Sequence, residues 1–417
     1  MKTFRINVPG SKSITQRALV AAALAKGASR LRTPLDSEDT RLLRNALSMM
    51  GADIDDSGDV WEIQGTSGVL TAPDREIFMG NNGTGIRFMV SVAALADGST
   101  TLEGTERMSE RPVEQLLNAL EGWGARCRSV AGNGCPPVIV NGGGITGGRT
   151  SLVAEKSSQF LSSMLLAAPY AASPAEIVLE GGLVSRPYVD ITMAVMSAFG
   201  IDVMETGNTF SIPGGCYSAR DYSVEGDASS ASYFWAAAAI TGSSVTVSNM
   251  PGNPLQGDAA FADILGAMGC KVTKDEQGVT VTGPPDGQLR GIDIDMERWP
   301  DVVPTLAATA LFARGETIIR NVPHLRIKET DRLRAMATEL SRAGADVREL
   351  EDGLVIRGGA TLNETEAETY DDHRIAMSMS LVGLRQDGIR ILDPSCVGKS
   401  FPDFWERWEE MRRSLNI

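Results

Sequence analysis

The chain has 417 residues, 42% of them hydrophobic, so it can bury large cores and is long enough for two domains. It carries 39 Lys and Arg against 53 Asp and Glu, and this net charge of −14 argues against general nucleic-acid binding. Five scattered cysteines without a CxxC pair, and only two histidines, argue against a disulfide framework and against a metal site.

The first ten residues, MKTFRINVPG, contain no apolar signal core. No apolar run in the chain is long enough to cross a bilayer as a helix. We therefore expect a cytoplasmic protein without membrane contact.

The first predicted helix follows a strand and a tight turn in VPGSKSITQRALVAAALAKG, residues 8–27. Ser11 and Ser13 are ordinary N-cap residues, but Lys12 and Arg17 lie where the helix dipole disfavours cations. A solvated surface lysine would explain Lys12 taken alone. The other interpretation is an anion held by the free amides, the hydroxyls and both cations.

Six segments along the chain share one plan, a polar start, an Ala-rich helix, a turn and a β-like run, at a period of roughly 70 to 75 residues. The segments are 17–33, 87–104, 160–181, 233–250, 304–322 and 374–393.

A second signature keeps the same period, because five further helices end in glycine and continue into alternating apolar residues. The pattern predicts left-handed C′ caps followed by strand hairpins. The glycines are Gly51, Gly124, Gly200, Gly269 and Gly344. The last repeat lacks its hairpin and ends in FPDFWERWEEMRRSLNI. We expect the N-terminal strand, residues 3–8, to complete it and to bring the chain ends together.

Each repeat therefore reads as strand, helix, strand, helix, strand, strand, which makes the chain an α/β protein with a pseudo-sixfold internal repeat. Repeats of this length favour two globes of three repeats each. A crossover in YSVEGDASSASYF predicts one domain of residues 1–10 and 227–417 and a second of residues 11–226.

Charged and hydroxyl side chains gather at the starts of equivalent helices. Polar helix starts need no function, but a purely structural role predicts acidic residues there and not this many lysines and arginines. If the helix starts face one cleft, their cations and free amides converge on a polyanionic ligand. The residues are Lys12, Ser13, Arg17, Gly83, Arg87, Arg111, Ser157, Ser158, Gln159, Ser185, Arg186, Tyr188, Asp301, Lys328, Glu329, Arg332, Asp372, His373, Arg374 and Lys399.

Seven stretches in order, PGSKSITQRAL, NNGTGIRF, SERPV, SSQFLSSML, RIKETDRL, DDHRIAMS and GKSFPDFW, resemble the 3-phosphoshikimate 1-carboxyvinyltransferase family of enolpyruvyl transferases. The resemblance covers essentially the whole chain. It implies two globular domains of three βαβαββ units each, an inside-out α/β barrel, with the active site in the cleft between them. It implies no cofactor and no metal, and we expect a monomer that acts on small molecules and not on nucleic acid.

The family reaction moves the enolpyruvyl group of phosphoenolpyruvate onto the 5-hydroxyl of shikimate 3-phosphate and releases phosphate. By motif, the resemblance assigns shikimate 3-phosphate to Lys12, Ser13, Arg17, Ser157, Ser158, Gln159, Ser185, Tyr188, Asp301 and Lys328. It assigns phosphoenolpyruvate to Lys12, Gly83, Arg111, Gln159, Arg332, Arg374 and Lys399.

The chemistry needs an acid at the methylene carbon and a base for the hydroxyl proton. Lys12, Asp301 and Glu329 are the candidates, with Asp301 as the base and the other two as proton carriers at the carbon. For Glu329 a plain ion pair with Arg332, three residues on, remains the alternative.

Two positions depart from the family pattern, since Phe88 stands where many members have proline and Gly85 where alanine is frequent. Two rival functions are weaker. The UDP-N-acetylglucosamine enolpyruvyl transferases carry a cysteine before the equivalent Arg-Pro, where LEGTERMSERP has Glu106. A non-catalytic anion-binding scaffold would not need carboxylates among its cations.

Overall fold

The computed structural model describes residues 2–285 and 288–417, and the chain divides into two compact units. Gly10–Val224 form the continuous unit, and residues up to Pro9 together with Glu225–Ile417 form the discontinuous unit. The chain thus passes between the units twice. These crossings lie one and two residues before the positions expected from the sequence.

The continuous unit is built from six α-helices, two 3-10 helices and twelve strands among its described residues. Its helices are α1 (Lys12–Leu24), α2 (Glu38–Met49), α3 (Gly83–Leu95), η1 (Glu106–Glu110), α4 (Glu114–Glu121), α5 (Gln159–Ala167), η2 (Ala168–Tyr170) and α6 (Pro187–Ala198). Its strands are β2 (Ala28–Arg32), β3 (Asp53–Asp55), β4 (Val60–Gln64), β5 (Ile77–Phe78), β6 (Ser99–Glu103), β7 (Arg126–Ser129), β8 (Val138–Asn141), β9 (Gly148–Val153), β10 (Ala175–Glu180), β11 (Met204–Thr206), β12 (Thr209–Ile212) and β13 (Asp221–Ser223).

These strands form three sheets with one shared topology, in the orders β13-β2-β4-β3, β5-β6-β8-β7 and β9-β10-β12-β11. In each sheet the first pair is parallel and the next two pairs are antiparallel. The predicted threefold repeat of this unit is therefore confirmed, including its hairpins.

The discontinuous unit follows the same plan. Its helices are α7 (Ala228–Thr241), η3 (Gly257–Ala259), α8 (Ala260–Ala267), η4 (Pro300–Val302), α9 (Val303–Ala310), η5 (Pro323–Ile327), α10 (Arg332–Arg342), α11 (His373–Val382), η6 (Pro394–Lys399) and α12 (Phe404–Leu415). Its strands are β1 (Thr3–Ile6), β14 (Ser244–Val247), β15 (Lys271–Asp275), β16 (Gly278–Thr282), β17 (Leu289–Arg290), β18 (Asp293–Asp295), β19 (Ala313–Arg314), β20 (Glu316–Arg320), β21 (Asp346–Glu349), β22 (Leu354–Arg357), β23 (Thr365–Ala367) and β24 (Ile389–Ile391).

Two of its sheets repeat the four-stranded order, as β1-β14-β16-β15 and β18-β20-β22-β21. The last repeat keeps only the parallel pair β23–β24 and continues into α12. A short pair, β17–β19, is additional.

The predicted partner of the N-terminal strand was wrong. β1 does not complete the last repeat but pairs in parallel with β14, with Thr3 opposite Ser244. There it covers an edge of β14 that would otherwise expose unpaired backbone groups. The expected meeting of the chain ends is confirmed, because Nζ of Lys2 donates to the carbonyl of Asn416 at 3.2 Å.

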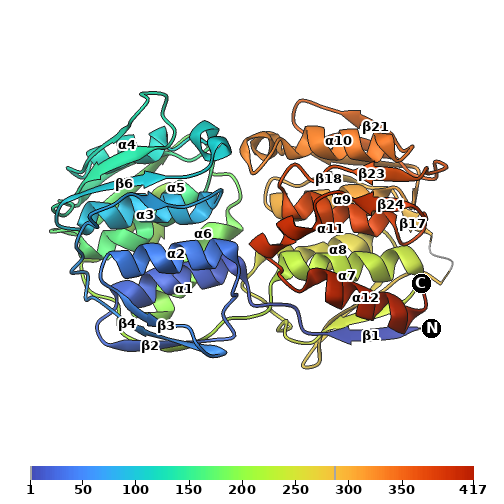
Figure 1. Ribbon diagram of the computed structural model, residues 1–417, viewed down its shortest axis with the longest axis horizontal. Coiled ribbons are helices and arrows are strands. Elements are labelled where there is room, and N and C mark those ends of the chain that lie inside the picture. The colour runs from blue at the N-terminus through green and yellow to red at the C-terminus, as the bar shows by residue number, and fades with distance from the viewer. Residues whose placement is uncertain (1, 286–287) are drawn as a thin grey trace. The chain divides into compact units, whose positions relative to one another are not determined.

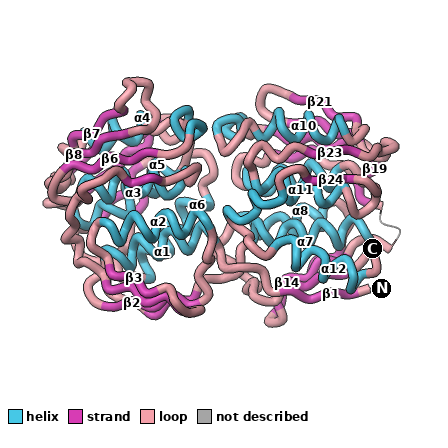
Figure 2. Tube along the Cα trace, in the orientation of Figure 1, coloured by secondary structure: helices cyan, strands magenta, loops and turns pink. Residues whose placement is uncertain are grey.

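The Ala-rich helices form the interior of each unit. In α1, α3, α5, α7, α9 and α11 nearly every residue is buried, as expected for helices that are apolar on all faces. Within each unit, Figure 2 shows helices inside and strands outside, and Figure 1 gives the element order. This is the predicted inside-out α/β arrangement. The five predicted C′ glycines all have positive φ, from 81° at Gly124 to 114° at Gly51, which confirms the caps.

Candidate active site

Lys12 is the first residue of α1, directly after Ser11, whose hydroxyl accepts from the amide of Ile14. Its ammonium lies 3.0 Å from Oδ2 of Asp39, in the first turn of α2. The side chain of Asp39 is only 3% exposed and that of Lys12 is 12% exposed. A buried carboxylate therefore offsets the unfavourable position of Lys12 at a helix N-terminus.

Arg17 brings several of the predicted residues together. Its Nη1 donates to the carbonyl of Ser13 at 2.8 Å, and its Nη2 donates to the carbonyl of Tyr188 at 3.1 Å. The hydroxyls of Ser162 and Thr192 accept two further bonds. Burial lowers the pKa of Arg17 to about 10. Arg17 thus joins the start of α1 to the start of α6.

Phe88, one of the two departures from the family pattern, lies under this guanidinium. It is fully buried, and the Cζ of Arg17 lies 5.2 Å from its ring centroid. A cation over an aromatic face is stabilised by the ring quadrupole. The aromatic residue therefore supports a predicted phosphate-binding arginine.

The starts of α3 and α5 meet through Gln159 and Arg87. Oε1 of Gln159 accepts from Nη1 of Arg87 at 2.6 Å, and Nε2 of Gln159 donates to the hydroxyl of Thr84 at 2.9 Å. Nη2 of Arg87 also donates to the carbonyl of Pro112, next to Arg111. Arg87 is absent from our predicted ligand assignments. The sequence feature that could have identified Arg87 is its position in NNGTGIRF, where an arginine follows a helix start.

The remaining serines of this unit also lie at helix starts. Ser157 and Ser158 directly precede α5 and are 6% and 4% exposed. Ser185 lies just before α6, is 4% exposed and has a φ of +54°. Left-handed backbone at a non-glycine residue is uncommon and is found often at functional sites.

Arg111 and Gly83 are in direct contact. Nη1 of Arg111 donates to both the carbonyl and the side-chain oxygen of Asn81, each at 2.9 Å. A Cβ on Gly83 would lie 2.3 Å from Nη2 of Arg111. Only glycine at position 83 therefore leaves room for this buried guanidinium.

In the discontinuous unit, Arg332 is the centre of a carboxylate network. Its guanidinium donates to Asp372 at 2.7 Å, to Asp301 at 3.0 Å and to Glu329 at 2.7 Å. Arg332 is 2% exposed and Asp372 is fully buried. These carboxylates raise the pKa of Arg332 against the lowering effect of burial.

Asp301 is shared between two arginines, since Nη2 of Arg374 donates to its Oδ2 at 2.8 Å. Burial acts to raise its pKa, but Arg374, Arg332 and Lys328 outweigh this and hold the pKa of Asp301 well below its usual range. Asp301 therefore stays ionised. The ion pair between Glu329 and Arg332 that we kept as an alternative is present, and a role for Glu329 in proton transfer remains a prediction.

The other predicted residues of this unit, together with His324, lie around the same network. Lys399 ends η6, which packs on α11, and is 5% exposed. Lys328 directly follows η5. His324 lies in η5, where burial and the charge of Lys328 lower its pKa to about 3. His373 is the first residue of α11 and is fully buried.

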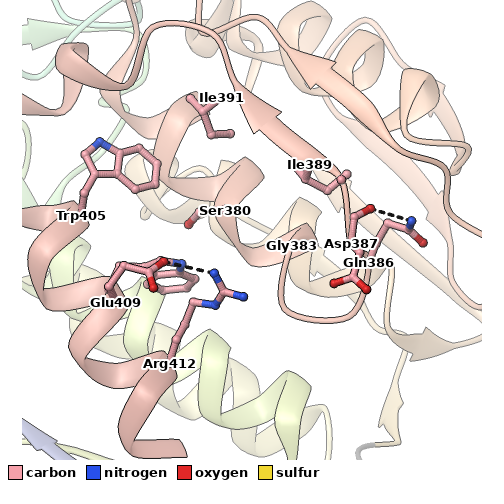
Figure 3. A pocket seen from close by; sticks show the side chains of 11 residues that line it. Ser380, Gly383, Gln386, Asp387, Ile389, Ile391, Trp405, Glu409 and Arg412 are labelled. Carbon is pink, nitrogen blue, oxygen red and sulfur yellow. Dashed lines mark hydrogen bonds and ion pairs between the residues drawn. The ribbon is translucent and has the colours of Figure 1, made fainter. Parts of the chain in front are cut away.

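A separate cavity in the discontinuous unit contains none of the predicted site residues. Its volume is about 230 Å³, and it lies between α12, the end of α11 and β24 (Figure 3). It is lined by Ser380, Gly383, Gln386, Asp387, Gly388, Ile389, Ile391, Trp405, Trp408, Glu409 and Arg412. In Figure 3 Arg412 pairs with Glu409, at 3.1 Å.

Among residues 2–285 and 288–417, no group of three or more His, Cys, Asp or Glu side chains is arranged to hold a metal ion. Within the same residues, no helix has the length and apolar character needed to span a bilayer. The five cysteines are all free thiols.

A model of the EPSP synthase (3-phosphoshikimate 1-carboxyvinyltransferase) family matches residues 3–408. The chain belongs to this family. The 3-phosphoshikimate 1-carboxyvinyltransferase of Vibrio atlanticus (strain LGP32) is 44% identical over 414 residues, which cover 96% of this chain and 95% of the relative. That of Yersinia pestis bv. Antiqua (strain Angola) is 45% identical over 412 residues, with coverage of 97% and 95%.

A solved structure of the EPSP synthase from Acinetobacter baumannii matches the fold with a TM-score of 0.81 at 30% identity. The match covers 98% of this chain and 95% of that chain. The resemblance inferred from seven motifs is thus confirmed. Membership in the EPSP synthase family supports enolpyruvyl transfer from phosphoenolpyruvate to shikimate 3-phosphate, in aromatic biosynthesis, over both rival functions.

Proposed function

We propose that the protein transfers the enolpyruvyl group of phosphoenolpyruvate to the 5-hydroxyl of shikimate 3-phosphate, with both units contributing residues. The observation that carries this proposal is the Arg332–Asp301–Arg374 network, in which a carboxylate remains ionised between two buried arginines. Such a group can accept a hydroxyl proton while the arginines attract an anionic substrate.

In the proposed binding mode, the continuous unit supplies most contacts to shikimate 3-phosphate. Ser13, Ser157 and Ser158 donate hydroxyl hydrogen bonds to its phosphate, Arg17 provides positive charge, and Gln159 lies between the two substrates. The support is that Arg17 and Gln159 already link the four helix starts concerned. Ser185, Tyr188, Lys328 and Asp301 complete this set.

Phosphoenolpyruvate carries a carboxylate and a phosphate, and bidentate arginine forks suit both groups. We assign it to Arg111, Arg332 and Arg374, with Lys12 and Lys399 as further cations and Gly83 leaving room beside Arg111. Removing one such positioned cation from an enzyme costs on the order of 10²- to 10³-fold in turnover.

The proposed chemistry is addition followed by elimination. The 5-oxygen of shikimate 3-phosphate attacks C2 of phosphoenolpyruvate while C3 gains a proton, giving a tetrahedral intermediate that still carries the phosphate. Loss of a C3 proton and departure of the phosphate then restore the double bond. Asp301 is assigned to the hydroxyl proton, and Lys12 and Glu329 to the protons at C3.

The test is phosphate release by the purified protein from phosphoenolpyruvate with shikimate 3-phosphate, compared with UDP-N-acetylglucosamine as the acceptor. We expect release with the first acceptor only. Asp301→Asn should lower kcat at least 10²-fold, a typical cost of removing a positioned base. Asp263→Asn, which alters a surface carboxylate paired with Lys274, serves as the matched control. Release with neither acceptor would contradict the proposal.

We also propose that the protein acts as a cytoplasmic monomer. Five free thiols suit a reducing compartment. Sedimentation equilibrium at working concentration measures the mass directly, and a dimer mass would contradict the monomer.

A further inference from the structure

The connection between β23 and α11 contains two consecutive residues with left-handed backbone. Tyr370 has a φ of +55° and Asp371 a φ of +53°. Neither is glycine, so each pays a conformational penalty that the surrounding structure has to offset. The next residue, Asp372, caps α11 and contacts Arg332, and Arg374 follows two residues later.

A fully buried carboxylate on α10 holds this connection on one side. Oε2 of Glu339 accepts from the amide of Glu368 at 3.1 Å, and Oε1 accepts from the hydroxyl of Tyr370 at 2.6 Å. Tyr370 as a residue is 39% exposed, but its hydroxyl binds the buried carboxylate of Glu339. Arg342 is the third group bound to Glu339, with its Nη1 3.1 Å from Oε1.

The same helix holds the connection on its other side. Arg332 and Glu339 are seven residues apart, so they lie on one face of α10, the helix that packs against α11. Arg332 binds Asp372, which follows the left-handed pair, while Glu339 binds the amide of Glu368 before the pair and the hydroxyl of Tyr370 within it. Side chains of one helix, α10, therefore hold the chain on both sides of the left-handed pair.

We propose that Glu339 and the hydroxyl of Tyr370 are positioning residues for anionic substrate binding. They hold the left-handed pair 370–371 and thereby fix the place of Arg374 relative to Asp301. This inference rests on the proposed function only in taking Arg374 as a ligand of phosphoenolpyruvate. In this proposal neither residue contacts the substrate. Their effect passes through the turn.

The decisive variant is Tyr370→Phe, which removes one hydroxyl and keeps the ring. We expect the KM for phosphoenolpyruvate to rise about tenfold, a size in keeping with one hydrogen bond to a charged group. We expect kcat to change less than threefold and the melting temperature to fall by only a few degrees. Glu339→Gln, which leaves one acceptor oxygen for several donors, should raise the same KM.

The matched control is Arg342→Gln, which removes the third partner of Glu339 without touching the turn. It should leave the KM for phosphoenolpyruvate within twofold of wild type. An unchanged KM in Tyr370→Phe, or an equal rise in Arg342→Gln, would overturn the proposal. A variant in which kcat and the melting temperature fall while the KM values for both substrates rise would also overturn it, because that pattern indicates general destabilisation. A wild-type protein without phosphate release would instead reject the proposed function.

Discussion

Lys12 shows how a single residue is understood only with its tertiary partner. From the sequence, a cation at a helix N-terminus suggested an anion, and removing it would not be expected to lower stability. In the structure its ammonium is paired with Asp39, a carboxylate that is almost fully buried. The position was predictable from the motif. The partner, 27 residues away on another helix, was not.

Lys12→Met should therefore lower both activity and stability. We expect kcat to fall on the order of 10²-fold, the typical cost of losing a positioned proton carrier or electrostatic contact. Stability should fall because Asp39 loses this ion pair while remaining buried. The double variant Lys12→Met/Asp39→Asn should regain the stability and stay inactive. Steady-state kinetics and urea unfolding measure the two effects, and wild-type stability in the single variant would contradict the ion-pair argument.

Asp258 gives a pH dependence of stability. Burial raises the pKa of its carboxyl to about 7, and the charges of Asp301 and Asp227 add to this rise, against hydrogen bonding from Ser229 and the charge of Arg374. The folded state thus binds this proton more tightly than the unfolded chain. The favourable contribution is fully present below the unfolded pKa of 3.8 and is lost as the pH rises through 7.

Asp258→Asn removes this titration and keeps the shape. Its stability relative to wild type should increase by about 2 kcal/mol between pH 5 and pH 8. Urea unfolding at both pH values measures the difference, and groups common to both proteins cancel in the comparison. The same offset at pH 5 and pH 8 would show that Asp258 does not titrate in this range.

At the scale of single elements, the candidate site is built from the starts of helices. The start of α3 explains why this chain has glycine at position 85. Asn82 caps this helix by accepting from the amide of Gly85 at 2.8 Å. A Cβ on Gly85 would lie 2.4 Å from Nδ2 of Asn82 and 2.7 Å from Cε of Met79. Alanine at this position would therefore have to displace the capping side chain of Asn82 and the end of Met79.

Gly85→Ala should displace the Asn82 side chain and destabilise the protein by about 1 to 2 kcal/mol, the usual cost of a lost N-cap. Gly214→Ala is the control, since nothing lies within 4 Å of the position of its Cβ. Thermal unfolding of both variants decides the matter. Equal melting temperatures for the two would show that the cap adapts.

Much of the element plan was predictable because it repeats. Alanine-rich runs recur in all six repeats and C′ glycines in five of them, so the helices and hairpins were predictable from local sequence. The pairing of β1 with β14 carried no such signal, because Thr3 and Ser244 meet through a long-range edge contact. Glu339 was missed for a related reason: an acidic residue within an amphipathic helix ordinarily faces solvent, and here its partners come from a different element.

At the scale of the whole molecule, each unit carries its own cluster of buried cations, around Arg17 and Arg111 in one and Arg332 and Arg374 in the other. Substrates that bind both clusters would neutralise them together and favour a closed arrangement. We expect the radius of gyration in small-angle scattering to fall when shikimate 3-phosphate and an unreactive phosphoenolpyruvate analogue are added. Sodium sulfate at the same ionic strength is the control. An unchanged radius with both ligands would contradict this expectation.

The two crossings also determine the order in which the two units can fold during synthesis on the ribosome. β1 is synthesised first, yet its partner β14 follows the entire continuous unit. The amide of Asp227 donates to the carbonyl of Pro9 at 2.8 Å, so the segments flanking that unit are joined at its base. Once residues 10–224 have folded, the long separation between β1 and β14 is replaced by a short effective loop, which lowers the entropic cost of their pairing. We therefore expect the continuous unit to fold during translation and the discontinuous unit only after it. β1 stays unpaired until β14 has been synthesised.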